Sequence, residues 1–274
     1  MGVRTNLIAE EMNDILREVL EAEDTELLLV RPTRGAFEAL VSVATAFEGS
    51  PPTIRVLADE SLLKDVVDDF IVASNAADLV DDGVLELRTS TVDEGNTLVV
   101  TDDAVLALVT ASEQVAALAS DDDSLVASAF ETYTAVWDDS PEFTLRTPSL
   151  SVVRESLESD ISVDIRADFD TVLSSLQTVR GDDQGLDEVT ISLLVAAKNE
   201  VLLYDISKWG EDIGIASKAT FSRTKTKLED LGLVDTEKVP IDVGRPRLRL
   251  KLGDDRLRQA DADQLAGVAQ SILT

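Results

Sequence analysis

The segment SKATFSRTKTKLEDLG, residues 217–232, constrains the fold more than any other part of the chain. Ser217 is a typical helix-capping residue. Phe221, Thr224 and Leu228 are three, four and seven residues apart, so they share one face of the predicted helix and should pack inward. The opposite face is rich in hydroxyl and cationic side chains, which is typical of a helix that enters the major groove of DNA.

The surrounding residues 186–253 have the order helix, short strand, helix, helix, hairpin. Residues 201–203 predict the short strand, and Gly214 predicts the turn before the helix just described. Residues 233–236 and 248–252 predict two paired strands, because leucine alternates with arginine and lysine in the second of them. The tip between these strands, VPIDVGRPR, would be a wing. This order predicts a winged helix-turn-helix.

The charge of the chain is distributed unevenly. The sequence holds 54 acidic and 24 basic residues, which gives a net charge of -30. Residues 187–251 hold 11 of each sign, so the rest of the chain carries the whole excess. Within residues 213–252 there are 9 basic and 5 acidic residues. A basic helix and wing in so acidic a chain predict a polyanionic partner there.

We expect the exposed side of the 217–232 helix and the wing to contact double-stranded DNA. The residues expected near base edges are Ala219, Thr220, Ser222 and Arg223, and Thr226 lies on the same face. The residues expected near phosphates are Ser217, Lys218, Lys227, Arg245 and Arg247. The alternative is a winged helix that binds another protein in a transcription complex, with its lysines and arginines merely solvated.

Strands alternate with helices through residues 1–140, which predicts an open α/β domain. The predicted strands are 26–30, 54–57, 84–88, 97–101 and 105–109, and the predicted helices are 6–22, 36–47, 61–78 and 124–137. Asp102 and Asp103 form the turn of an antiparallel hairpin made by the last two strands. We interpret this domain as a sensor.

Two further segments complete the organisation. Residues 141–185 predict helices that connect the two domains, and residues 254–274 predict a C-terminal helix. The apolar stripe of that last helix consists of Leu257, Leu265, Val268 and Ile272. It could pair with a second copy in a homodimer, or pack back on its own domain. The whole chain is therefore predicted to be α/β in its first domain and α+β overall.

The absence of histidine and cysteine from the sequence excludes much familiar catalysis. The chain offers no imidazole as a general base or metal ligand, and no thiolate as a nucleophile or metal ligand. It also lacks a glycine-rich phosphate loop. The acidic clusters Asp102–Asp103 and 121–123 are interpreted as solvated turns rather than a cation site. No catalytic residue, metal or cofactor is predicted; an enzyme acting on a nucleotide or sugar phosphate without these groups is the remaining alternative.

The best candidates for an effector site follow the first two predicted strands. In an open α/β sheet, ligands bind beyond the carboxyl ends of the strands. Arg31, Thr33 and Arg34 follow one strand, and Asp59 and Ser61 follow the next. Two arginines beside a helix start would suit a sugar phosphate or another anionic metabolite, whereas ordinary ion pairs of exposed arginines are the alternative.

The acidity of the chain also predicts its surroundings. Carboxylates recur along most of the sequence and lysine is scarce. Molar salt shortens the screening length to about 3 Å and lets such carboxylates crowd together, so a salt-rich cytoplasm is expected. The N-terminal residues MGVRTNLIAEEMNDIL do not resemble a secretion signal, and no run of apolar residues predicts a membrane span.

The segments SKATFSRTKTKLEDLGLVD and GRPRLRL resemble the helix and wing of archaeal winged-helix regulators. An acidic α/β domain followed by this module is similar to the haloarchaeal TbsP family, which implies a cytoplasmic transcriptional regulator linked to central carbon metabolism. The first half, including the helix AFETYTAVW, also resembles the phospholipase-D-like sensor domain of TrmB-type sugar regulators, with the domain order reversed. The paired histidines of phospholipase D chemistry are absent, so only the scaffold could be shared.

Overall fold

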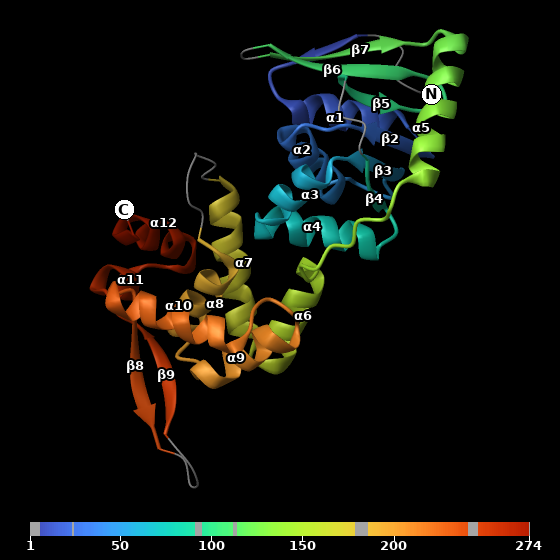
Figure 1. The fold of residues 1–274 in the computed structure, drawn as a ribbon. Coiled ribbons are helices and arrows are strands. Elements are labelled where there is room, and N and C mark those ends of the chain that lie inside the picture. Colours follow the sequence, from blue (N-terminus) through green and yellow to red (C-terminus); the bar gives the residue numbers. More distant parts are fainter. Residues whose placement is uncertain are drawn as a thin grey trace. The chain divides into compact units, whose positions relative to one another are not determined.

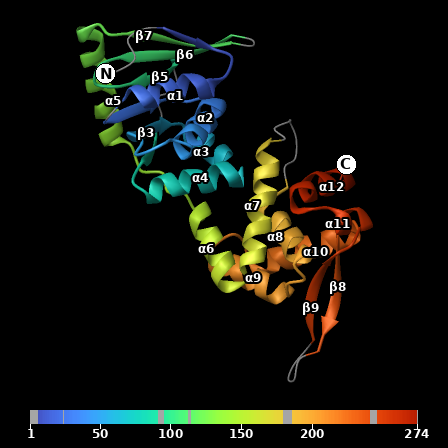
Figure 2. The same ribbon diagram turned by 180° about the vertical axis from the view of Figure 1, so that it is seen from behind.

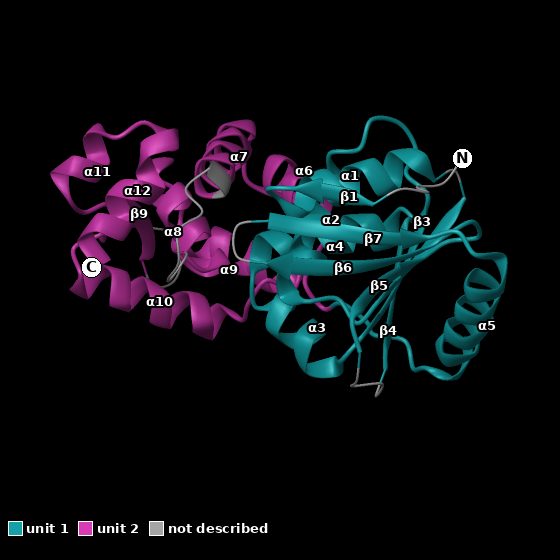
Figure 3. Ribbon diagram, turned by 90° about the horizontal axis from the view of Figure 1, so that it is seen from above, with its two compact units in different colours: residues 1–145 teal, residues 146–274 magenta. Residues whose placement is uncertain are grey.

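The computed structural model describes residues 6–23, 25–90, 95–111, 114–178, 186–240 and 246–273. The chain forms two compact units, Met1–Leu145 and Arg146–Thr274 (Figure 3). The boundary lies five residues beyond the predicted one. The helices expected to connect two domains are part of the second unit. No helix within the described ranges is both long and apolar enough to cross a bilayer.

The first unit is built on one mixed sheet of seven strands (Figure 1). In sheet order these are β1 (Leu7–Ala9), β7 (Gln114–Ser120), β6 (Val105–Ala111), β5 (Thr97–Val100), β2 (Glu26–Val30), β3 (Thr53–Ala58) and β4 (Leu85–Thr89). The pairs β2–β3 and β3–β4 are parallel, and all other neighbours are antiparallel. The predicted α/β class is therefore confirmed, as is the antiparallel pairing of β5 with β6.

Helices cover the two faces of this sheet unequally. The larger core packs α1 (Met12–Ala22), α2 (Arg34–Thr45), α3 (Glu60–Val67) and α4 (Phe70–Asp81) against one face. A smaller core packs α5 (Asp123–Asp139) on the other, through Val126 and Trp137. Parallel strands require a crossover, and α2 supplies it between β2 and β3, while α3 and α4 supply it between β3 and β4.

Three elements of the first unit differ from the sequence prediction. The helix predicted over 61–78 is two helices, because the side chain of Asp69 caps α4 by accepting from the N–H groups of Ile71 and Val72 at 3.0 and 3.2 Å. The first helix begins at Met12, and β1 precedes it. Strand β7 was not predicted, since its sequence QVAALAS is rich in alanine, which is depleted in strands.

The second unit has the order predicted for a winged helix-turn-helix, preceded by two helices (Figure 2). Its elements are α6 (Leu150–Asp160), α7 (Val163–Thr178), α8 (Glu188–Lys198), α9 (Leu203–Asp212), α10 (Lys218–Asp230), β8 (Val234–Val239), β9 (Arg247–Leu252), α11 (Asp255–Gln259) and α12 (Ala262–Leu273). The predicted short strand is reduced to one bridge between Leu202 and Arg249. The hairpin register pairs Val234 with Leu252 and Val239 with Arg247.

The C-terminal segment is two helices rather than the single one predicted. Helix α12 packs on α7 and more lightly on α8, and it buries Leu265, Ala266 and Ala269. Leu257 of α11 is also fully buried. Much of the stripe considered for pairing with a second copy therefore packs inside its own unit, which is the second of the two arrangements that the sequence left open.

Candidate nucleic-acid interface

The two helices of the helix-turn-helix pack unusually closely. A Cβ on Gly210 of α9 would lie 2.4 Å from Cε2 and Cζ of Phe221 on α10, and Phe221 is fully buried. The turn between the helices is closed by the Ile215 N–H, which donates to the Gly210 carbonyl at 2.8 Å, and Gly214 adopts a φ of 85°. The missing side chain at Gly210 thus fixes how α10 lies across α9.

Helix α10 presents the predicted contact face to solvent. Ser217 caps it by accepting from the Thr220 N–H at 3.2 Å. The exposed residues of the face are Ser217, Ala219, Ser222, Arg223, Thr226 and Lys227, and Lys218 and Thr220 are partly exposed. Arg223 donates through Nη2 to the Thr220 hydroxyl at 3.3 Å. The structure therefore brings all the predicted helix residues together on one accessible surface.

The inward face of α10 differs from the prediction in one residue. Phe221 and Leu228 are buried as expected, but Thr224 is only half-buried, and Lys225 is buried instead. The Lys225 ammonium lies 2.6 Å from Glu229 Oε2, and Glu229 Oε1 accepts from the Thr236 hydroxyl at 2.8 Å. This network joins α10 to the first strand of the wing.

The wing contributes Arg247, whereas Arg245 lies outside the described residues. The Arg247 guanidinium stacks 4.4 Å from the ring centroid of Tyr204 near the start of α9. Its Nη1 lies 3.5 Å from Asp205 Oδ1. Tyr204 is 47% exposed, so an aromatic side chain and an arginine form one surface beside the base of the wing. The sequence prediction did not include Tyr204.

The cations of this surface fall into two groups. Lys218 is paired with Glu211, and Arg247 with Asp205. Hydrogen bonding by the Lys218 ammonium lowers the pKa of Glu211, and the same contact raises the pKa of Lys218. Arg223 and Lys227 have no carboxylate within ion-pair distance in the part of the chain that the structure describes. Two helix cations are thus available to a ligand without breaking an existing pair.

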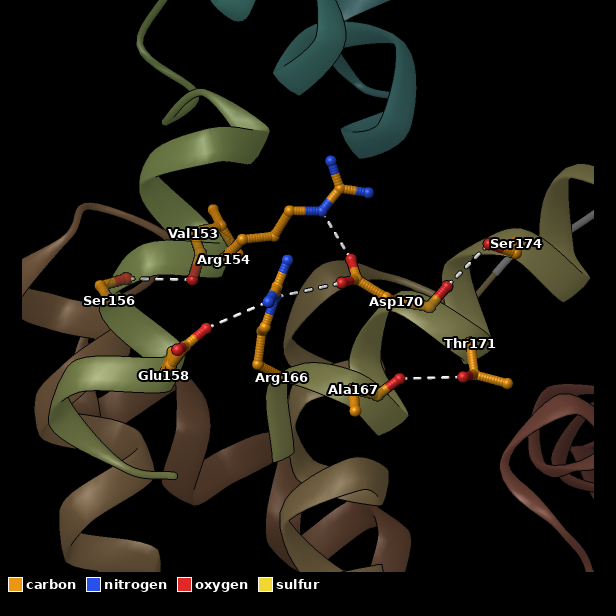
Figure 4. A network of polar contacts seen from close by, with 9 residues as sticks. All are labelled: Val153, Arg154, Ser156, Glu158, Arg166, Ala167, Asp170, Thr171 and Ser174. Atoms are coloured by element: carbon orange, nitrogen blue, oxygen red, sulfur yellow. Dashed lines mark hydrogen bonds and ion pairs between the residues drawn. The ribbon is translucent and has the colours of Figure 1, made fainter. Parts of the chain in front are cut away.

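Helices α6 and α7 pack against the helix-turn-helix, α6 on α9 and α7 on α8. Trp209 of α9 is buried, and its indole N–H donates to the Ser156 hydroxyl of α6 at 2.9 Å. Figure 4 shows how α6 and α7 are joined: Arg154 Nε lies 2.5 Å from Asp170 Oδ1, and Arg166 contacts Glu158 at 3.1 Å and Asp170 at 3.3 Å. One hydrogen bond, from Trp209 to Ser156, therefore ties α9 to α6, and ion pairs join α6 in turn to α7.

The residues proposed for an effector site lie at the carboxyl ends of β2 and β3, as expected. Arg31 adopts a φ of 51° and donates to the Asn96 carbonyl at 3.2 Å and to the Tyr133 hydroxyl at 3.3 Å. Thr33 caps α2 by accepting from the Ala36 N–H at 3.2 Å. Both side chains already serve the local structure, so an anion would have to share them.

The remaining effector candidates are also engaged. Arg34 pairs with Glu38 at 2.8 Å, and this hydrogen bond raises its pKa. Asp59 caps α3 by accepting from the Ser61 N–H at 2.7 Å, and it accepts from the Ser61 hydroxyl as well, which lowers its pKa. These contacts favour the ordinary ion pair for Arg34, and an effector role for the set stays a prediction.

The structure brings the two acidic clusters together. Asp102 and Asp103 line the same hollow as Asp121 and Asp123, with Phe130 of α5 beside them. The hollow is open and has a volume of about 370 Å³. Within the described ranges no three potential ligand side chains are placed to hold one metal ion.

This fold defines a protein of the winged helix-turn-helix class. The chain belongs to the TbsP-like family of transcriptional regulators. Residues 4–148 match the family model "Transcriptional regulator TbsP-like, N-terminal". Residues 149–270 match "Transcriptional regulator TbsP-like, C-terminal HTH domain", which includes α6 and α7 with the winged helix. No curated protein sequence matches the chain.

Solved structures show more distant similarity. TrmBL2, an archaeal chromatin protein described with a novel mode of DNA binding, is 16% identical over 52% of this chain and 55% of its own, with a TM-score of 0.35. This chain therefore spans about half the length of TrmBL2. Nuc, a phospholipase D family member from Salmonella typhimurium, is 11% identical over 51% of this chain and 97% of its own, with a TM-score of 0.35. The Orc1 protein of Aeropyrum pernix, solved with DNA, is 12% identical over 86% of this chain and 70% of its own, with a TM-score of 0.24.

Proposed function

We propose that this protein regulates transcription by binding double-stranded promoter DNA with α10 in the major groove and the β8–β9 hairpin against the backbone. One observation carries the proposal. In a chain of charge -30, the solvent face of α10 offers Arg223 and Lys227 without a carboxylate partner among the described residues. Unpaired cations on an exposed recognition helix are what a phosphate backbone attracts.

The proposed contacts divide by role. Ala219, Thr220, Ser222 and Arg223 approach base edges, and Thr226 shares their face. Ser217, Lys218, Lys227, Arg245 and Arg247 hold phosphates. We add Tyr204 to the residues proposed to contact phosphates, because its exposed ring stacks on Arg247. The first helix of a helix-turn-helix crosses the DNA backbone, so a role for Tyr204 of α9 beside a phosphate agrees with that docking.

The proposal extends to the biological setting. The acidic composition supports a halophilic archaeon, and the family resemblance supports control of central carbon genes by a non-enzymatic sensor. A homodimer would match a two-fold operator. An anionic metabolite, such as a sugar phosphate, would be sensed beside Arg31 and Arg34 at the carboxyl ends of the parallel strands.

Genome-wide occupancy of the tagged protein in its own host tests this proposal. The wild type should give discrete promoter peaks, which a variant with Arg223→Ala and Lys227→Ala should lose. Lys64→Ala is the control, since Lys64 is an exposed cation on α3 of the first unit. Promoter peaks that persist in the double variant would reject the α10 contacts. An absence of peaks for the wild type under several carbon sources would instead favour a protein-binding winged helix.

A further inference from the structure

The side chain of Glu211 pairs with Lys218, the cation at the start of the proposed recognition helix α10. Its Oε2 accepts from the Lys218 ammonium, and its Oε1 accepts from the Lys218 backbone N–H at 3.3 Å. Both side chains are 43% exposed, so the pair lies at the surface and open to exchange. A carboxylate that receives both an ammonium and a backbone N–H makes the same contacts that a phosphate oxygen would make.

A second carboxylate of α9, that of Asp205, pairs with Arg247 of the wing. Asp205 Oδ1 lies 3.5 Å from Arg247 Nη1, and the two side chains are 41% and 40% exposed. Lys218 and Arg247 come from different elements, yet both are paired with residues of α9. Arg223 and Lys227, on the middle of α10, have no such partner in the described part of the chain.

We propose that Glu211 and Asp205 are built-in competitors of DNA, which hold Lys218 and Arg247 until a phosphate displaces them. This inference rests on the proposed function. Arg223 and Lys227 make the first contacts, because they need no exchange. Lys218 and Arg247 follow only when the duplex is seated closely enough for phosphates to replace the two carboxylates. Loosely held, non-matching DNA therefore gains only part of the available cation contacts.

The competition has a measurable signature in salt. Each phosphate that a protein neutralises adds about 0.9 to the slope of log affinity against log salt. A freed carboxylate that stays beside the duplex offsets one of these charges. Removing the charge of Glu211 should therefore tighten binding to DNA and steepen the slope by up to about one. Glutamine keeps an oxygen for the Lys218 N–H, so the helix start remains intact.

Fluorescence anisotropy with a pool of random-sequence 30-bp duplexes tests the inference on the full-length protein across a salt series. We expect Glu211→Gln to bind about two- to fivefold more tightly than wild type. Asp230→Asn is the matched control, because it removes one charge from an exposed residue of α10 that pairs with none of the described cations. Asp205→Asn repeats the experiment at the wing and should also tighten binding.

A double-variant cycle separates competition from a general change of charge. Lys218→Ala should abolish the gain from Glu211→Gln, since no cation is then released. An equal gain in Glu211→Gln and Asp230→Asn, or a gain that survives Lys218→Ala, would overturn the inference while leaving the proposed function standing. A failure of wild type and all variants to bind the duplexes at any salt would overturn the proposed function and the inference together.

Discussion

The indole N–H of Trp209 donates to the hydroxyl of Ser156 at 2.9 Å and thereby joins α9 of the helix-turn-helix to α6. Trp209 is 2% exposed, so this donor has little access to water. A buried donor left without an acceptor costs about 1–3 kcal/mol. The contact therefore couples the stability of the helix-turn-helix to the two helices that precede it.

Ser156→Ala should lower the stability of the second unit by about 1 kcal/mol or more, because the Trp209 N–H loses its acceptor. Denaturant unfolding followed by tryptophan fluorescence measures the loss. Ser159→Ala on the exposed side of α6 should change stability by less than about 0.5 kcal/mol. Equal effects of the two substitutions would show that the hydrogen bond to Trp209 contributes nothing.

Alanine at two helical glycines should have opposite effects. Gly210→Ala places a Cβ 2.4 Å from the ring of Phe221, and overpacking of a buried site costs about 1–3 kcal/mol, which outweighs the better helix propensity of alanine. Gly267→Ala in α12 meets nothing within 4 Å, so it should stabilise by up to about 1 kcal/mol. Thermal unfolding of the two variants tests this. A stabilised Gly210→Ala would contradict the close packing of α9 on α10.

Arg223→Ala should weaken DNA binding and relax specificity together. A base-edge contact is worth about 1–3 kcal/mol of discrimination, which corresponds to a five- to 150-fold change. Selection of bound sequences from a random duplex pool, followed by affinity measurement, compares the variant with wild type. If affinity falls uniformly over all sequences, Arg223 contacts a phosphate rather than a base.

Burial raises the pKa of Glu188 in the first turn of α8 above the ordinary value of 4.5, and the neighbouring Asp187 adds to the shift. A carboxyl with a raised pKa in the folded state costs stability as it ionises, so this cost grows as pH rises through the window above 4.5 and persists at neutral pH. Glu188→Gln should therefore gain Tm relative to wild type between about pH 4 and pH 7. A difference that is constant or shrinks with pH would contradict the shift.

The recognition helix could be predicted from the sequence because its signals are local. A capping serine, an apolar face and a glycine turn each depend on neighbouring residues. The apolar spacing nevertheless placed Thr224 inward where the structure buries Lys225. A long side chain can bury its alkyl stem when its ammonium finds a partner, and the partner here is Glu229 one turn later.

The signals that failed are those that depend on distant parts of the chain. Strand β7 exists because β6 and β1 pair with its backbone, which requires no strand-forming side chains. The link between Ser156 and Trp209 joins residues 53 positions apart. Glu211 and Asp205 are acidic residues of a predicted helix, but only the folded turn places Glu211 beside Lys218, and only the packing of β9 on α9 places Asp205 beside Arg247.

Glu229 has one oxygen on Lys225 of its own helix and the other on Thr236 of β8. This carboxylate links the two elements directly. A rotation of α10 about its axis would strain the bond to Thr236, so α10 and the β8–β9 hairpin should bind DNA as one rigid body with a fixed distance between them. A duplex with altered groove geometry would then lose the helix contacts and the hairpin contacts together, because neither element could adjust without the other.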